Sequence, residues 1–450
     1  MSPARLSALD AAFLSLESGH APMHVGWAAL FDPPASGSPP RFEEIRAHIA
    51  SRLGRAPRYR QRLAHVPLGL GDPVWVDDER FDIADHVVRA GQRGFERLAD
   101  EVLSAPLEHG RPLWQLSIAD DLPGGRIGVV GKAHHCLVDG LAAVELMALL
   151  LDAEPAPAAD GAARDDWTAR AAPSALGLVR DAVGRQLDEA LQVARLPLAL
   201  ARDPGGAARQ AWRAARAVAQ AAAPVASPSR LNDAMTSARH LATQSRPIED
   251  LKLVKRRFGT TLNDVLLAAC AGALRALDGE AHTKAKAMVP VSIQVTGKDW
   301  GNRIAFLFID LPCEEHDAVW RLRDVHVAMR ERKRGGVPEG ADIVLNALSY
   351  APRSIRRVAS RVIASPQLSN LTISNIPGPQ VPVYLMGCEA REAYPVVPLT
   401  DRHGLSIGMT TIHGRACFGV YAQAGLAAEA DAIAAGIGEE VDVLVRRAAA

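Results

Sequence analysis

The most constraining feature of the sequence is a short polar motif, His-His-Cys-Leu-Val-Asp-Gly, at residues 134–140. An apolar run with strand character, residues 127–131, precedes the motif, and a stretch with helical character, residues 141–151, follows it. The motif is therefore expected where a strand ends. Because successive side chains of a strand point to opposite faces, only one of His134 and His135 can face a given cavity. We expect one histidine to carry chemistry and the other to serve as scaffold.

The residues of the motif are suited to acid-base chemistry. An imidazole titrates near neutral pH, so it can take a proton from an alcohol or return one to a thiolate. Asp139, four residues after His135, could fix an imidazole tautomer or pair with an arginine that shapes the turn. Gly140 permits a backbone conformation or a close approach that a Cβ atom would block. A hydrogen-bonded core histidine is the alternative, because buried polar groups are normally paired.

A metal site formed by His134, His135 and Asp139 is a weaker interpretation of the same residues. Adjacent histidines diverge on a strand, and the sequence offers no further cluster of His and Cys residues to complete a tetrahedral set of ligands. We therefore assign no metal ligand.

The length and the charge of the chain limit the number of domains and the classes of protein to which it can belong. With 450 residues, the chain exceeds the usual size of one domain, so two domains of about 200 residues each are expected. Its 51 lysine and arginine residues balance its 51 aspartate and glutamate residues. This balance argues against a nucleic-acid-binding protein that relies on a global positive field.

The cysteines and the N-terminal segment indicate a cytoplasmic protein. The cysteines are odd in number, scattered and free of Cys-x-x-Cys spacing, which is typical of reduced thiols; they are Cys136, Cys270, Cys313, Cys388 and Cys417. The N-terminal segment lacks the apolar core of a secretory signal, and no apolar run reaches the roughly 20 residues that a membrane span needs. Any contact with a membrane or a lipid droplet surface is therefore expected to be peripheral.

The pattern His-His-x-x-x-Asp-Gly resembles the active-site signature of the CoA-dependent acyltransferase superfamily. The rest of the chain resembles the wax ester synthase/diacylglycerol acyltransferase family of that superfamily. The similarity runs from Leu6 to about Phe418 and is weak only in residues 152–230. Its main segments are the opening stretch from Leu6 to Phe13, Pro112-Leu113-Trp114, Asn263-Asp264, two strand-like runs joined by a turn at residues 289–293 and 301–306, and Ser374-Asn375-Ile376-Pro377-Gly378-Pro379.

Each of the shorter segments also has an ordinary structural explanation. Trp114 could be a core residue of a strand. Asn263 or Asp264 could cap a helix that runs through Leu277. Pro377 and its neighbouring glycine could end a strand in a turn. These alternatives stay open at this point.

The resemblance implies an α/β fold with two chloramphenicol-acetyltransferase-like domains, each a mixed sheet with helices, around a shared tunnel. Residues 1–151 would form the N-terminal domain with the motif, and residues 231–450 the C-terminal domain. Residues 152–230 would be a linker and a helical crossover.

The resemblance also implies an O-acyltransferase that moves a long-chain acyl group from acyl-CoA to a fatty alcohol or a diacylglycerol, giving a wax ester or a triacylglycerol. His135 would be the general base, Asp139 a mainly structural partner, and Asn263 or Ser374 a donor to the oxyanion. Acyl-CoA would be a co-substrate, and no cofactor or covalent acyl-enzyme would be required. The sequence does not rank the two acceptors, since one methylene group changes discrimination only modestly.

Two other classes of protein stay open. Gly404-Leu405-Ser406-Ile407-Gly408 fits the Gly-x-Ser-x-Gly pattern of serine esterases and lipases, which requires a strand, a sharp turn and a helix around the serine. Here the flanking residues 405–412 and 415–421 instead predict two strands of a hairpin. A non-catalytic lipid-binding relative is the other class. The chain also departs from the family at Gln423, where an aspartate is common.

Two basic segments could bind phosphate or lipid. Residues 353–361 place arginines at helical spacing, and the crossover combines many arginines with Trp212. The crossover also repeats apolar residues every four positions up to an interruption at Pro197; these are Val179, Val183, Leu187 and Leu191. Either segment could be a solvated face. We favour the former as a lipid-docking surface because its charges are denser; they are Arg353, Arg356, Arg357 and Arg361.

Overall fold

The computed structural model describes most of the chain, with gaps that include the end of the polar motif. The described residues are 4–91, 94–137, 149–155, 167–202, 205, 206, 209, 212, 225–277, 285–293, 303–334 and 353–450. Asp139 and Gly140 lie outside them.

The first of two large sheets is mixed and carries the motif strand near its middle. Its strands lie in the order β12 (Tyr384–Leu385), β13 (Cys388–Val396), β2 (His24–Asp32), β7 (Arg126–His134), β6 (Trp114–Leu122) and β5 (Val87–Arg89). Only the β5–β6 pair is parallel. The α-helices that the structure describes in this half are α1 (Ala8–Leu16), α2 (Phe42–Arg52), α3 (Ile83–His86) and α4 (Phe95–Ser104).

Alternating side chains give this first sheet two apolar faces. Ala29 and Val129 belong to one buried cluster, which also takes in Ile45 and Ile49 of α2. Their strand neighbours Ala28 and Val130 belong to another cluster with residues of α4. This is the two-residue period expected of a sheet covered on both sides. Beside the sheet lies a small antiparallel one of β1 (Ala4–Arg5), β4 (Val74–Asp77) and β3 (Gln61–Ala64).

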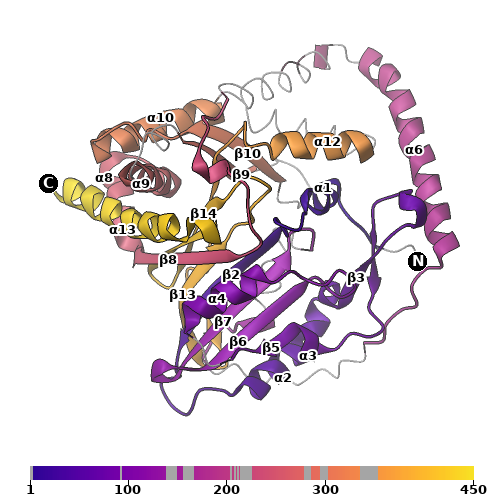
Figure 1. The fold of residues 1–450 in the computed structure, drawn as a ribbon, viewed down its shortest axis with the longest axis horizontal. Helices are drawn as coiled ribbons and strands as arrows, with labels where there is room; N and C mark the ends of the chain where they lie inside the picture. The colour runs from indigo at the N-terminus through magenta and orange to yellow at the C-terminus, as the bar shows by residue number, and fades with distance from the viewer. Residues whose placement is uncertain are drawn as a thin grey trace.

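The second large sheet is also mixed. Its strands lie in the order β10 (Arg303–Asp310), β9 (Lys286–Ile293), β11 (Leu371–Ile376), β14 (Leu405–Ile412), β15 (Arg415–Gln423) and β8 (Arg239–Pro247), with β11 parallel to both its neighbours. Helices group beside it in Figure 1; they are α8 (Ile248–Phe258), α9 (Leu262–Ala276), α10 (Ala318–Arg334) and α13 (Ala427–Ala449). The predicted fold class, two mixed sheets with helices, is confirmed.

The second half of the chain contributes two strands to the first sheet. β12 and β13 come from the second half, yet β13 pairs with β2 in the first sheet. The predicted domain boundaries at residues 151 and 230 stay a prediction, and the first sheet draws strands from both sides of them.

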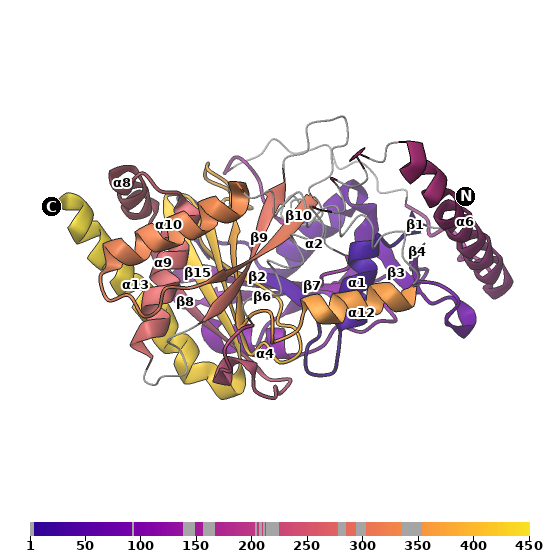
Figure 2. The ribbon, with the colours of Figure 1, turned by 90° about the horizontal axis from the view of Figure 1, so that it is seen from above.

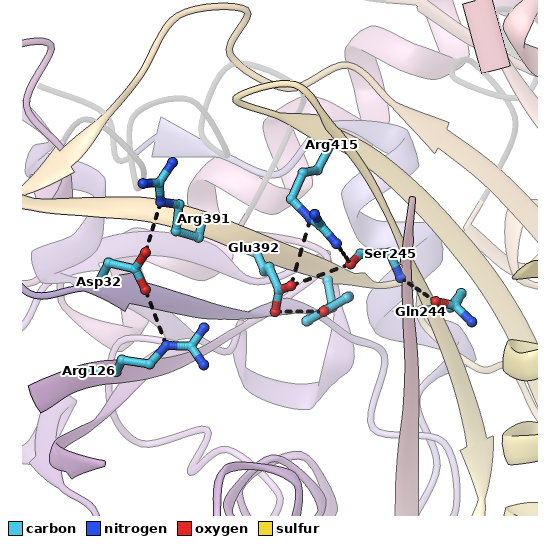
Figure 3. A network of polar contacts seen from close by, with 8 residues as sticks. Asp32, Arg126, Gln244, Ser245, Arg391, Glu392 and Arg415 are labelled. Carbon is cyan, nitrogen blue, oxygen red and sulfur yellow. Dashed lines mark hydrogen bonds and ion pairs between the residues drawn. The ribbon is translucent and has the colours of Figure 1, made fainter. Parts of the chain in front are cut away.

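Charged side chains fasten β13 to both sheets (Figure 3). Asp32, at the end of β2, binds Arg391 Nε at 2.9 Å and Arg126 Nε at 3.3 Å. The next residue of β13, Glu392, faces Arg415 of the second sheet, with 3.8 Å between Oε1 and Nε. A β-bulge at Arg391 interrupts the register with β2 at this point. At this bulge, the consecutive side chains of Arg391 and Glu392 bind to residues of different sheets.

The backbone of β13 lies directly against two glycines of the second sheet. Gly408 of β14 and Gly419 of β15 are cross-strand partners. A Cβ atom at Gly419 would lie 2.3 Å from the carbonyl oxygen of Pro395, and one at Gly408 would lie 2.9 Å from Pro395 Cγ. Only glycine permits this approach. Ser406 adds a hydrogen bond, because its Oγ donates to the carbonyl oxygen of Val397 at 2.8 Å.

The Gly-x-Ser-x-Gly pattern is therefore part of an interface between the sheets. Ser406 lies within β14, which forms an antiparallel hairpin with β15, as the flanking residues predicted. Its side chain is 1% exposed. No strand-turn-helix elbow surrounds it. Gln423 ends β15, where its side chain accepts a hydrogen bond from the backbone of Gly425 at 3.3 Å.

The crossover is anchored on the N-terminal half and then forms a long helix at the edge of the molecule. Arg170 Nε binds Asp77 Oδ2 at 2.9 Å, and this bond, with burial opposing it, lowers the pKa of Asp77 to about 2. The helix α6 (Ala175–Arg202) lies along the right edge of Figure 1. The expected interruption at Pro197 was wrong, because a proline removes only its own donor and a helix can continue past it.

We expect Gly419→Ala to destabilise the protein by about 1–3 kcal/mol or more, because the added methyl group overpacks the contact with Pro395. Thermal unfolding measures the effect. Gly184→Ala is the matched control, since a Cβ at Gly184 of α6 meets nothing within 4 Å. That change should be neutral or slightly stabilising. Equal melting temperatures for the Gly419 variant and the parent would contradict the packing argument.

Candidate active site

The polar motif begins at the end of β7 and continues into a turn. The backbone nitrogen of His134 donates to the carbonyl oxygen of Leu113, and that of His135 donates to the carbonyl oxygen of Met23, each at 2.9 Å. The two residues are thus held from opposite sides, by the segment before β6 and by the segment before β2. The described part of the motif ends at Leu137.

His134 is completely buried, and its hydrogen bonds shape the turn. Its Nδ1 accepts from the backbone nitrogen of Cys136 at 3.1 Å. A neutral His134 must therefore carry its proton on Nε2. That atom lies 3.8 Å from Glu17 Oε2, and the other oxygen of Glu17 is 2.9 Å from His109 Nε2. His134 is 0% exposed, which suits a residue that fixes the path of the chain.

Burial keeps His134 neutral. It lowers the pKa of His134 to about 3, with smaller contributions from His109 and His135. The hydrogen bond with Glu17 raises the pKa of His109, with burial opposing it. His24 is the strand neighbour of His134 on β2. Its pKa is well below the ordinary value because of burial and then of the charge on Lys132.

His135 differs from His134 because the residue is not completely buried, although its Nδ1 atom is buried and has no hydrogen-bond partner in the described part of the chain. The ring of Phe13 stacks on it with 3.6 Å between centroids and an angle of 20°. Burial lowers the pKa of His135 to about 4, against a smaller opposing contribution from its own backbone. The imidazole is therefore neutral at physiological pH and has an available lone pair.

Three residues of this site were not assigned a role from the sequence: Phe13, Glu17 and His109. Phe13 and Glu17 belong to α1 and its C-cap, and Ser7 caps the other end of α1 with a reciprocal bond to Asp10. The opening stretch to Phe13 was noted only as a family similarity. No spacing in the sequence connects Glu17 with His109, which is 92 residues away.

Pro112, Leu113 and Trp114 support the motif from the adjacent strand. Trp114 is 1% exposed, stacks on His86 with 4.8 Å between centroids, and donates from Nε1 to the carbonyl oxygen of Tyr59 at 2.7 Å. Pro112 and Leu113 are buried. The structure thus places Trp114 in the core, where it positions the strand beside the motif.

Asn263 and Asp264 lie in the first turn of α9. Thr261, rather than either of them, is the N-cap, and Asp264 completes a capping box with it. Asp264 Oδ2 is also 2.8 Å from His326 Nδ1. Asp264 therefore has a structural place. Asn263 Nδ2 is buried and has no hydrogen-bond partner among the residues that the structure describes.

Ser374 and Asn375 are half-buried near the end of β11. Beyond them, Gly378 lies against β14, because a Cβ there would be 1.9 Å from the carbonyl oxygen of Thr411. The segment is therefore a strand followed by a close contact with a neighbouring strand. Within the described ranges, neither Ser374 nor Asn375 makes a hydrogen bond to the motif histidines.

All five cysteines are buried and form no disulfide bond. Burial, with a smaller contribution from Asp10, raises the pKa of Cys136 well above the ordinary value for a thiol, so it is a poor nucleophile. No three His, Cys, Asp or Glu side chains gather as a metal site in the described ranges. Nor does any helix described there have the length and apolar character to cross a membrane.

Comparison with known proteins covers the whole chain. Residues 6–266 match the family model of the wax ester synthase/diacylglycerol acyltransferase catalytic domain, and residues 300–444 match the C-terminal domain of the same family. Two relatives from Mycobacterium tuberculosis H37Rv carry the name "probable diacylglycerol O-acyltransferase". One is 30% identical over 461 residues, covering 98% of this chain and 95% of the relative; the other is 30% identical over 431 residues, covering 91% and 92%.

Solved structures show the same fold. The wax ester synthase/diacylglycerol acyltransferase from Marinobacter aquaeolei VT8 aligns over 100% of both chains with a TM-score of 0.70 and 24% identity. The starter condensation domain of rhizomide synthetase aligns with a TM-score of 0.57 and 14% identity, covering 100% of this chain and 95% of that one. With the two family domains matched in order along the sequence, this chain belongs to the wax ester synthase/diacylglycerol acyltransferase family and is an acyltransferase.

Proposed function

We propose that the protein transfers a long-chain acyl group from acyl-CoA to the hydroxyl group of a fatty alcohol or a diacylglycerol, with His135 as the general base. The observation that carries the proposal is the state of His135, a half-buried residue with a neutral imidazole at the end of a central strand. A base in this state can accept a hydroxyl proton without first losing one.

The proposed reaction is one direct transfer. His135 accepts the proton of the alcohol while the alcohol oxygen attacks the thioester carbonyl carbon. The tetrahedral intermediate collapses, the carbon–sulfur bond breaks, and the thiolate of CoA takes the proton back from the imidazolium. The products are an ester and free CoA. Protons and charges balance without a metal ion, a redox cofactor or an acyl-enzyme.

The donor to the oxyanion stays a proposal. Asn263 Nδ2 is a buried donor without a partner in the described part of the chain, and Ser374 offers a half-buried hydroxyl group. In other acyl transfers, a preorganised donor of this kind lowers the free-energy barrier by about 2.7–4 kcal/mol. Asp139 lies outside the described residues, and its structural role stays a prediction.

The function is tested with radiolabelled palmitoyl-CoA and two acceptors, hexadecanol and dioleoylglycerol, followed by separation of the lipid products. We expect labelled ester with at least one acceptor. Acyl-CoA hydrolysis without any ester would indicate an esterase, and binding without turnover would indicate a non-catalytic lipid-binding protein.

His135→Ala should lower turnover by at least about 100-fold, because the general base is lost. His134→Ala should instead lower the melting temperature together with activity, because it removes the acceptor for the backbone of Cys136 and leaves a buried gap. Steady-state rates and thermal unfolding of both variants separate the two roles. Near-normal turnover by a folded His135→Ala protein would refute the assignment.

The pH profile provides an independent test. Because the pKa of His135 is lowered to about 4, its basic form persists as the pH falls through the range where an ordinary histidine gains a proton. We expect kcat/KM to stay level from pH 7.5 to about 5.5, where a histidine with a pKa of about 6.5 would lose roughly tenfold. Circular dichroism at each pH confirms that the protein is folded. A half-maximal rate near pH 6.5 would contradict the burial argument.

We also propose that the protein docks peripherally on a lipid surface, because its acceptors partition into lipid. The surface favoured from sequence, the arginines of α12 (Arg353–Ile363), is a poorer candidate than expected. Arg353 and Arg356 both bind Asp72, at 2.9 and 2.7 Å, so part of their charge is neutralised. The crossover helix α6 is the better candidate. Its exposed apolar residues are Leu176, Val183, Leu187 and Leu191, which are 79%, 43%, 62% and 55% exposed.

Changing Leu187 and Leu191 to serine should reduce co-sedimentation with phosphatidylglycerol liposomes, because these side chains would insert between lipids. Transfer to a short, soluble alcohol should be unchanged. The matched control changes Val358 and Val362 of α12, which are 61% and 57% exposed. If both double variants lose the same amount of liposome co-sedimentation, or if neither loses any, α6 is not the docking surface.

A further inference from the structure

A cavity of about 230 Å³ lies between α1 and α12, which run beside each other in Figures 1 and 2. The wall from α12 is cationic and contains Arg353, Arg356 and Arg357. The wall from α1 consists mainly of small side chains: Ala8, Ala11, Ala12 and Ser15. Ser15 Oγ lies 3.2 Å from Ser360 Oγ and links the two helices.

The arginines of this cavity are held in place but keep free donors. Asp72 binds Arg353 and Arg356, which fixes their direction. Arg356 Nε is buried and has no hydrogen-bond partner among the described residues. Arg357 is exposed and makes no ion pair within the described ranges. Three guanidinium groups against one carboxylate leave a net positive charge, and planar guanidinium donors match phosphate oxygens.

Two lining residues connect the cavity with the histidine motif. Glu17 and His109 both line it, and Glu17 Oε2 is 3.8 Å from His134 Nε2. Glu17 Oε1 is 2.9 Å from His109 Nε2, and the guanidinium groups in the lining all belong to α12. Phe13, which lies between two lining residues of α1, is not part of the lining and stacks on His135. Helix α1 therefore connects the cavity with His135.

We propose that this cavity binds the phosphate groups of acyl-CoA, with the pantetheine arm passing the C-terminal end of α1 to reach His135. The inference rests on the proposed function. Acyl-CoA carries its negative charges at one end and its thioester at the end of a narrow arm. The cavity has guanidinium groups on its α12 wall, and its lining residue Glu17 lies beside His134 of the motif.

The test compares two single substitutions on α12. Arg357→Gln removes an exposed guanidinium group that lines the cavity, and Arg361→Gln, on the same helix but outside the cavity lining, is the matched control. Each variant is assayed with palmitoyl-CoA and with the palmitoyl thioester of N-acetylcysteamine, which has no phosphate. We expect Arg357→Gln to raise KM for palmitoyl-CoA about tenfold, the effect of one charge-assisted hydrogen bond. KM for the phosphate-free thioester should not change, and Arg361→Gln should change neither.

Direct binding separates this inference from the proposed function. CoA is titrated into each protein by calorimetry, and phosphatidylglycerol liposomes are tested in parallel. Loss of CoA affinity in Arg357→Gln alone supports the inference, even if the parent protein transfers no acyl group and the proposed function fails. Equal CoA affinity in all three proteins overturns it. It is also overturned if Arg357→Gln weakens only liposome binding, because the site would then take lipid head groups.

Discussion

The contact between β13 and the paired glycines of the second sheet sets the distance between the two halves of the protein. A Cβ atom at Gly419 would clash with the carbonyl oxygen of Pro395, and one at Gly408 would crowd the Pro395 side chain. β13 therefore packs on the second sheet while it pairs with β2 in the first. Since β2 is also the neighbour of β7, the position of the motif strand relative to the second half depends on this contact. The adjacent residues Arg391 and Glu392 reinforce it with ion pairs to both sheets.

The same arrangement explains why two histidines adjacent in sequence have different surroundings. His134 is the last residue of β7 and lies opposite His24 of β2, so its ring is enclosed by strands and by Glu17. His135 has left the strand, and its backbone nitrogen donates to the carbonyl oxygen of Met23. Phe13 stacks on its ring from a helix whose residues are all only half-buried. His134 is therefore completely enclosed, whereas the cover over His135 is one half-buried helix.

Local patterns predicted much of this fold. The sequence pattern indicated the strand β7 before the motif and the β14–β15 hairpin, and the hairpin already argued against a serine nucleophile at Ser406. Long-range placement could not be predicted in this way. The insertion of β13 into the first sheet, the approach of Glu17 to His134 and the pairing of Arg356 with Asp72 each join segments that no spacing connects. Because Arg356 pairs with Asp72, the basic helix α12 forms one wall of a cavity, whereas its sequence had indicated a free charged face.

The electrostatics of the site constrain the order of events in the proposed reaction. Burial makes the protonated form of His135 unstable, as its pKa of about 4 indicates. An intermediate that contains both an imidazolium and a free alkoxide would therefore have a high free energy. The proton transfer to His135 is favourable only if the new carbon–oxygen bond forms at the same time and draws charge onto the carbonyl oxygen. The same instability then makes the imidazolium a strong acid, which returns its proton to the departing thiolate. A poorly solvated base thus favours a coupled transfer in both halves of the reaction.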